Sequence, residues 1–179
     1  MIKTLALTED DYLTYYLYTA SRSKKIQSNR RKSWLIISIC FLVLGMLFIN
    51  NNKFYAYYFF AFGIICFIFY PSYQSYEYKK RYKKHVSDNY QYKVGVACEI
   101  NFQPDFIETK DATSESKFST NEVVEINEIS SHYFIKTRSG SSIILSKAAI
   151  NSPSFITDLI AIFNNPNIVI NKQLEWRWK

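Results

Sequence analysis

The stretch WLIISICFLVLGMLFINNNKFYAYYFFAFGIICFIFY, residues 34 to 70, decides how this chain folds. Its two apolar blocks, residues 34–49 and 54–70, contain no charged side chain. As helices they are roughly 24 and 26 Å long, near the lower limit for crossing a hydrocarbon core of about 30 Å. A core helix of a small soluble protein needs a polar face, and neither block has one. The sequence therefore predicts a two-helix transmembrane hairpin.

Aromatic side chains mark both ends of this hairpin. Trp34 and Tyr70 fall at one end, and Tyr55, Tyr57 and Tyr58 fall at the other. Amphipathic rings favour the water interfaces of a bilayer. We therefore predict these five residues as membrane-interface aromatics.

Basic residues flank the hairpin but are scarce in its turn. The flanks carry Arg22, Lys24, Lys25, Arg30, Arg31 and Lys32 before the first block and Lys79, Lys80, Arg81, Lys83 and Lys84 after the second, whereas the turn carries Lys53. Positive residues resist translocation. The sequence thus predicts a multi-pass protein of a bacterial inner membrane, with both termini cytoplasmic and the turn NNNK, residues 50–53, outside.

Net charge divides the chain in the same way. Residues 1–93 carry +9 and residues 94–179 carry −2. The run YKKRYKKH, residues 78–85, has the composition of a nucleic-acid patch, but it follows shortly after an apolar block, so anionic lipid headgroups are the nearer partner. We predict headgroup contacts, and no nucleic-acid partner, for Arg30, Arg31, Lys32, Lys79, Lys80, Arg81, Lys83 and Lys84.

Two targeting signals fit the N-terminal part poorly. A cleaved signal peptide has a short basic start and a small-residue cleavage site, whereas 33 mostly polar residues come first here and Asn-Asn-Asn follows the first block. Arg30 and Arg31 precede an apolar block, but SNRRKSW is a poor twin-arginine match. We therefore expect the first block to stay in the membrane.

The hairpin divides the chain into four predicted regions. These are a cytoplasmic segment 1–33, the hairpin 34–70, a basic juxtamembrane segment 71–93 and a cytoplasmic β-rich domain 94–179. Within the first, residues 2–7 fit a short strand joining the distal sheet, and Thr8 with Asp11 forms a capping-box-like helix start. The stripe that follows contains Tyr12, Leu13, Tyr16, Leu17 and Ala20. Packing on the bilayer surface and packing on the protein's own core both stay open for it.

The distal domain shows strand periodicity followed by one helix. Val96, Cys98, Ile100 and Phe102 alternate with more polar residues, and Ser139-Gly140 is a hairpin signal. We expect about five short antiparallel strands. The closing helix has Pro153 in its first turn, the apolar stripe Phe155, Ile156, Leu159, Ile160 and Phe163, and the stop Asn164, Asn165 and Pro166. The predicted class is an α+β membrane protein.

The search for chemistry yields few candidates. His85 and His132 are far apart, and no Cys or His pair has zinc-ligand spacing. The three cysteines fit small buried apolar residues without a disulfide. The apolar blocks hold no ionisable residue, which disfavours a transporter or channel. We expect no cofactor, no metal and no catalytic residue. The enzyme alternative depends on a pocket that gathers His132, Glu99 and Asp105.

Three segments resemble a known family. LTEDDY at residues 7–12, FSTNEVVEINEISSHYFI at 118–135 and IILSKAAINSPSFITDLIAIF at 143–163 look like the YcxB-like family of small bacterial membrane proteins. The resemblance implies an inner-membrane hairpin with a cytoplasmic β-rich domain similar to pleckstrin-homology folds. It implies no established activity and supplies no catalytic residues.

These expectations combine into a noncatalytic regulatory or accessory role. The distal domain would bind another protein, or its own N-terminal segment, at the membrane surface. A membrane-anchored immunity protein against a toxin is the alternative, because small membrane proteins of that class also lack active-site patterns. For LEWRWK, residues 174–179, an interface anchor, a partner contact and a flexible tail all stay open.

Overall fold

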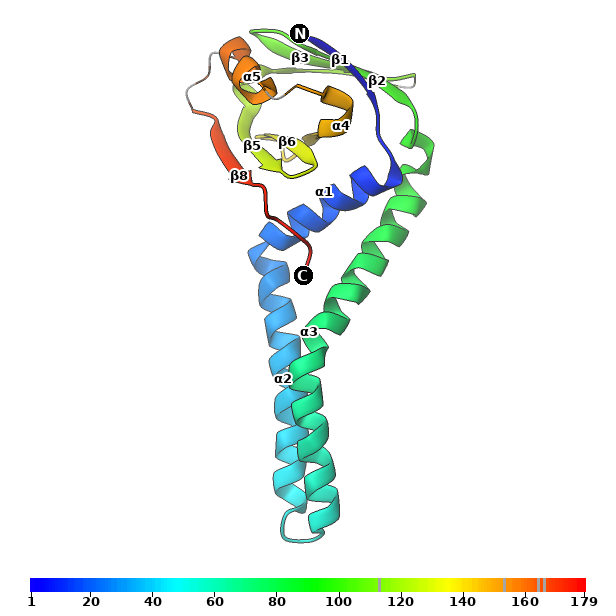
Figure 1. The fold of residues 1–179 in the computed structure, drawn as a ribbon, viewed down its shortest axis with the longest axis vertical. Helices are drawn as coiled ribbons and strands as arrows, with labels where there is room; N and C mark the ends of the chain where they lie inside the picture. The colour runs from blue at the N-terminus through cyan, green and yellow to red at the C-terminus, as the bar shows by residue number, and fades with distance from the viewer. Residues whose placement is uncertain (113, 153, 164, 166) are drawn as a thin grey trace. The chain divides into compact units, whose positions relative to one another are not determined.

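The computed structural model describes residues 1–112, 114–152, 154–163, 165 and 167–179 (Figure 1). Within these residues the elements are, in chain order, β1 Ile2–Ala6, α1 Glu9–Arg22, α2 Lys24–Phe48, α3 Lys53–Tyr90, β2 Ala97–Phe102, β3 Phe106–Lys110, β4 Glu115–Ser119, β5 Val123–Ile129, β6 His132–Thr137, β7 Ser142–Ser146, α4 Lys147–Ile150, α5 Phe155–Phe163 and β8 Val169–Gln173. Short 3₁₀ turns occupy Gln91–Lys93 and Thr120–Glu122. The chain divides into two compact units. The first unit comprises residues 1–15 and 85–177, and the second comprises residues 16–84 and 178–179.

Two sheets form the first unit, which confirms the α+β class. One sheet has the order β1-β2-β3-β4 with every pair antiparallel. The other has the order β7-β6-β5-β8, and β8 runs parallel to β5. The expectation of about five strands, all antiparallel, is therefore wrong. β8 escapes sequence analysis because VINKQ has only two apolar residues, and main-chain pairing with β5 makes it a strand.

The N-terminal strand is confirmed. β1 pairs with β2 from Ile2 opposite Asn101 to Ala6 opposite Ala97. Leu5 is 5 % exposed and belongs to the core, while its neighbours in the strand are more exposed. A strand that packs on a core with one side has one buried face and one exposed face, as β1 does.

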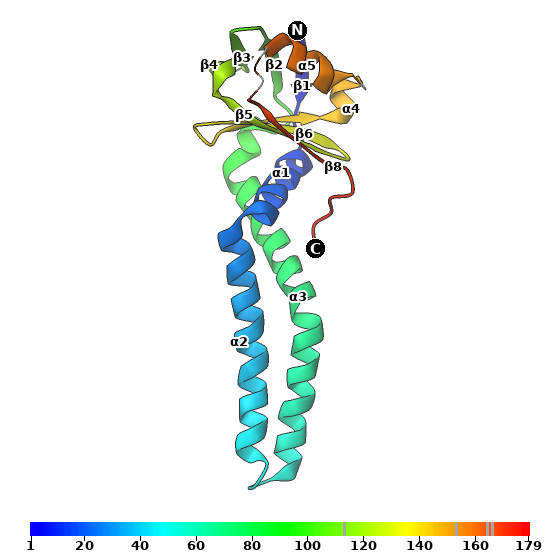
Figure 2. The same ribbon diagram turned by 90° about the vertical axis from the view of Figure 1, so that its left-hand side faces the viewer.

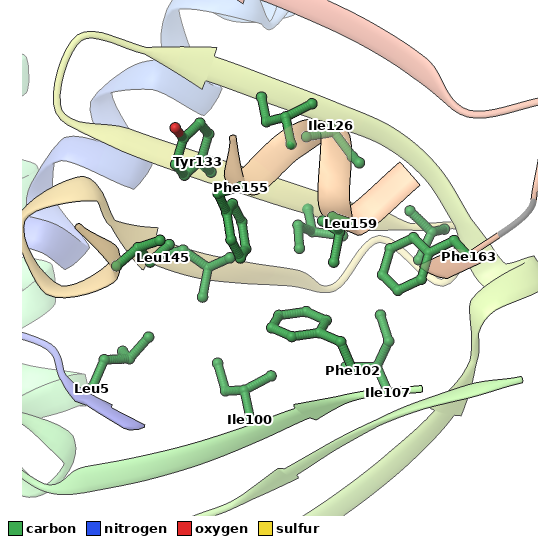
Figure 3. Close-up of a cluster of buried hydrophobic side chains, with 14 residues drawn as sticks. Leu5, Ile100, Phe102, Ile107, Ile126, Tyr133, Leu145, Phe155, Leu159 and Phe163 are labelled. Atoms are coloured by element: carbon green, nitrogen blue, oxygen red, sulfur yellow. The ribbon is translucent and has the colours of Figure 1, made fainter. Parts of the chain in front are cut away.

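The core of the first unit lies between the two sheets and includes α5. Figure 3 shows Phe155 and Leu159 between Ile100 and Phe102 on one side and Tyr133 on the other. The Phe155 ring centroid is 5.2 Å from that of Tyr133 and 6.0 Å from that of Phe102. The expected stripe on this helix is thus confirmed. Pro153, Asn164 and Pro166, expected at its ends, lie outside the described residues.

The second unit contains two long antiparallel helices, α2 and α3, which lie side by side in both ribbon views (Figures 1 and 2). Ring pairs join them along their length, with centroids 5.6 Å apart for Phe48 and Phe59 and 6.2 Å apart for Phe41 and Phe62. At Gly45 an added Cβ would lie 2.6 Å from the Phe60 ring. A larger residue at position 45 would therefore force the Phe60 ring to move, and glycine allows the close approach.

A short turn joins the helices where the sequence predicts one. α2 ends at Phe48 and α3 begins at Lys53. The Asn52 side-chain oxygen accepts hydrogen bonds from the backbone N–H groups of Phe54 and Tyr55, at 3.0 and 3.4 Å. Asn52 therefore caps the start of α3 and fixes the reversal of the chain.

Both helices extend beyond the apolar blocks. α2 begins at Lys24, and α3 continues through the basic segment to Tyr90.

The expectation of buried cysteines is wrong, because Cys40 is exposed and Cys66 and Cys98 are half-buried. All three thiols are free.

Candidate functional site

Pro71 lies inside α3 and changes the hydrogen bonding of that helix. Its ring nitrogen has no hydrogen, so the carbonyl of Phe67, four residues earlier, loses its helical donor. The indole Nε1 of Trp34 in α2 donates to this carbonyl over 3.0 Å. The Trp34 and Phe67 ring centroids are also 4.7 Å apart. Trp34 therefore replaces the donor that proline removes.

Two polar side chains one turn beyond Pro71 also bind α2. The Gln74 amide nitrogen donates to the Arg30 carbonyl over 3.2 Å, and Gln74 is only 8 % exposed. The guanidinium of Arg30 donates in turn to the Ser75 hydroxyl over 2.6 Å. These bonds fix the two helices to each other just after the proline.

The C-terminal end of the chain joins this group. The Trp178 indole donates to the Ser75 carbonyl over 2.9 Å. The Arg30 guanidinium carbon lies 5.1 Å from the Trp178 ring centroid and 5.7 Å from that of Tyr78, and Arg30 also donates to the Lys179 carbonyl over 3.0 Å. A cation within about 6 Å of two ring centroids is a favourable arrangement. We call Arg30, Trp34, Pro71, Gln74, Ser75, Tyr78 and Trp178 the base cluster.

The predicted site residues divide into two groups. Trp34 and Arg30 are half-buried in the base cluster, whereas the other predicted basic residues are exposed, namely Arg31, Lys32, Lys79, Lys80, Arg81, Lys83 and Lys84. Tyr55, Tyr57 and Tyr58 near the turn are 50, 70 and 49 % exposed. Tyr70 is half-buried, with its ring centroid 6.1 Å from that of Tyr73.

Sequence analysis missed five members of the base cluster. Gln74, Ser75 and Tyr78 recur at helical spacing after Pro71, which is a signal that they share one face. The sequence also allows the carbonyl without a helical donor to be predicted, because it always lies four residues before a proline inside a helix. Trp178 could not be assigned, because its contact depends on a chain separation of 103 residues.

A second polar site lies in the first unit around a buried histidine. His132 on β6 is 5 % exposed, and its Nε2 lies 2.7 Å from Oδ1 of Asp11 in α1. Its Nδ1 lies 2.8 Å from the Ser131 hydroxyl. The other oxygen of Asp11 accepts from the backbone N–H and hydroxyl of Thr8, at 2.7 and 2.8 Å. Because an ionised carboxylate only accepts, His132 donates through Nε2.

This pair connects the start of α1 to the outer face of one sheet. Burial alone raises the pKa of Asp11, but the hydrogen bonds from Thr8 and His132 outweigh it, so the pKa lies below 3.8. The Tyr15 ring contacts Phe134 with centroids 5.5 Å apart. Tyr12 and Leu13 are buried, and burial raises the pKa of Tyr12 to about 12. This end of the predicted stripe therefore packs on the protein's own fold.

The three residues of the enzyme alternative lie in different places. His132 faces α1, Glu99 lies on β2 opposite Lys110, and Asp105 lies in the turn between β2 and β3. Among the residues that the structure describes, no group of three or more His, Cys, Asp or Glu side chains is placed to hold a metal ion.

Comparisons with known proteins give no relative. No family model matches the chain, and neither a curated protein nor a solved structure matches it. The structures of the two units are therefore the basis for its proposed function.

Replacing Trp34 tests the bond at the proline. Trp34→Phe leaves the Phe67 carbonyl without a donor, and we expect it to lower the free energy of unfolding by roughly 1–3 kcal/mol. In a Pro71→Ala background, the restored N–H of residue 71 supplies the donor, so the same substitution should cost much less. Unfolding of the full chain in mild detergent measures both. Equal losses in the two backgrounds would contradict this account.

Replacing Asp11 tests the buried pair through its pH dependence. Because folding lowers the pKa of Asp11, its contribution is present above the unfolded value of 3.8 and is lost as pH falls through the folded pKa. We expect Asp11→Ala to lower the free energy of unfolding near neutral pH by about 1–3 kcal/mol. The difference from wild type should shrink below pH 3.8.

Thermal unfolding between neutral pH and pH 3 in detergent provides the measurement. Asp10→Ala is the matched control, since Asp10 is an exposed acid in the same helical turn. A deficit in Asp11→Ala that stays constant with pH, or an equal deficit in Asp10→Ala, would rule out the pair as its source.

Proposed function

We propose that this chain is a membrane protein whose hairpin, α2 and α3, crosses the bilayer and holds the α+β unit at its cytoplasmic face. The observation that supports the proposal is that the apolar side chains of α2 and α3 are exposed. Both helices are long and apolar enough to cross a membrane, and only 11 % of each apolar window is buried inside the protein. A core helix of a soluble protein would be mostly buried. Lipid is the solvent that such uncovered surfaces require.

The distribution of exposed apolar side chains favours the same conclusion. Ile36, Leu47, Phe54 and Phe69 are 60, 65, 74 and 63 % exposed, and most of the large exposed apolar side chains lie between residues 34 and 70. A patch of this extent in water would drive aggregation. In a bilayer it becomes the surface that faces lipid tails.

A hairpin that crosses the bilayer twice has both of its flanks on one side of the membrane. The flanks carry most of the basic residues, and the turn carries Lys53. Positive charge is retained in the cytoplasm, so we assign both termini to that side. The exposed Arg31, Lys32 and Lys79 then lie on the side where anionic lipids are enriched, which supports the predicted headgroup contacts.

The role proposed for the α+β unit is noncatalytic protein binding, of a regulatory or accessory kind. β8 is the last strand in its sheet order, and Val169 and Ile170 on it are 56 and 38 % exposed. Leu174 just beyond is 52 % exposed. An edge strand with exposed apolar side chains is a surface to which another chain can add a strand.

Topology is tested with reporters that are active only outside the cytoplasm. Fused at Asn51 the reporter should be active, and fused after Lys179 it should be silent, because the turn and the C-terminal end are assigned to opposite sides. A reporter that is active only in the cytoplasm serves as control and should give the inverse pattern. Activity of the first reporter at Lys179 would refute the orientation.

Partner binding at β8 is tested with a photo-crosslinking residue in intact cells. At Val169, on the exposed strand, irradiation should give a covalent adduct larger than the chain. Thr157, exposed on α5, is the matched control and should give none. Adducts at both positions alike, or at neither, would remove β8 as the binding edge.

A further inference from the structure

The part of α3 that follows Pro71 has two different faces. Its inner face carries Gln74, Ser75 and Tyr78 of the base cluster, and the Tyr82 ring stacks on that of Tyr16 with centroids 5.9 Å apart. Burial there raises the pKa of Tyr82. This face is therefore occupied by the protein itself.

The opposite face is exposed and carries aromatic residues followed by lysines. We call it the outer stripe, and it consists of Tyr73, Tyr76, Lys79, Lys80, Lys83 and Lys84. Its members recur at spacings of three and four residues, so they share one side of the helix. Tyr73 and Tyr76 are 58 and 65 % exposed. Aromatic rings next to the apolar block and lysines further along match the order of layers at a bilayer surface.

A straight helix would carry the last lysines of the outer stripe too far from the membrane. From Tyr70, the last residue of the apolar block, the rise along α3 is about 15 Å to Lys80 and about 21 Å to Lys84. The headgroup layer on each side of a bilayer is only about 5–8 Å thick. The screening length at physiological salt is about 8 Å. On a helix parallel to the membrane normal, Lys80 would therefore lie about 7–10 Å beyond the headgroup layer and Lys84 about 13–16 Å beyond it, so the last lysines would lie outside one screening length.

A bend in α3 at Pro71 would bring the lysines closer to the headgroups. Its ring pushes against the Phe67 carbonyl and opens the helix on the face that carries both residues. That face is the one turned toward α2, as the Trp34 bond to the Phe67 carbonyl shows. The outer stripe lies on the opposite face, so the bend is toward the stripe. In Figures 1 and 2, α3 changes direction near its middle.

We propose that the Pro71 bend, held by the Trp34 indole, turns the outer stripe toward the bilayer so that it binds anionic phospholipid headgroups. This inference rests on the proposed membrane function and specifies its lipid partner. Lys79, Lys80, Lys83 and Lys84 contact headgroup phosphates, and Tyr73 and Tyr76 lie at the interface. The apolar half of α3 thus crosses the membrane, while its basic half inclines along the surface.

The experiment measures depth by spin labelling of the full chain in bilayers that mix zwitterionic and anionic lipid. Cys40, Cys66 and Cys98 are first replaced by serine, and a single cysteine is introduced as Lys83→Cys or, for reference, Leu44→Cys. We expect headgroup depth at residue 83 and hydrocarbon depth at residue 44. Adding Pro71→Ala should straighten α3 and move the label at residue 83 into water, without moving the label at residue 44.

Lipid selectivity supplies the second measurement. Replacing Lys79, Lys80 and Lys84 together with Gln should move the label at residue 83 outward. Purely zwitterionic lipid should do the same. Arg81→Gln is the matched control, because Arg81 is exposed but lies off the outer stripe, and it should have little effect.

The outcomes separate the two proposals. A label in bulk water at residue 83, with hydrocarbon depth at residue 44, overturns the outer stripe and leaves the membrane hairpin intact. Labels in water at both positions overturn the hairpin as well. Headgroup depth at residue 83 that survives Pro71→Ala shows that the bend does not direct the stripe, and this also overturns the inference.

Discussion

The constraint on which the whole molecule depends is that α2 and α3 bury little of their apolar surface within the protein. A helix of this kind is stable only where its surroundings are as apolar as its side chains. Helical hydrogen bonds satisfy backbone groups within each helix, and ring contacts such as Phe48 with Phe59 join the two helices. In lipid the hydrophobic effect does not bring apolar helices together, so their association depends on van der Waals packing. The close approach at Gly45 increases that packing. The proposed membrane function gives these exposed side chains an apolar surrounding.

The base cluster compensates for a helical hydrogen bond that α3 lacks at Pro71. Pro71 removes a donor at the end of the apolar block, where an unpaired carbonyl is costly. Trp34 repairs the loss from the neighbouring helix, and Arg30 and Trp178 add bonds just beyond. A proline inside a helix is tolerated in this way because a side chain of another helix satisfies the freed group. The bend becomes available without an orphaned polar atom, and the direction of the basic half of α3 follows from it.

Local patterns predicted the elements whose stabilising contacts lie within a few residues. The capping pair of Thr8 and Asp11, the strand Ile2–Ala6, the turn at Asn52 and the apolar stripe of α5 all have such signals in the sequence. β8 had none, because its polar side chains give no alternation and a parallel partner, β5, is distant in sequence. Likewise, the buried pairing of His132 with Asp11 spans 121 residues, so spacing alone could not find it.

The sequence by itself determined that two uncharged apolar blocks form helices joined by a tight asparagine turn, and that basic residues gather at their flanks. Hydrophobicity and charge are properties of single residues and short windows, so no fold is needed to read them. Only the tertiary structure decided that Trp34 and Arg30 face inward while the lysines of α3 face outward. Which side of a helix is occupied depends on what packs against it, and Trp178 comes from the far end of the chain. The same predicted residues therefore divide into a group that packs inside the protein and a group that is exposed.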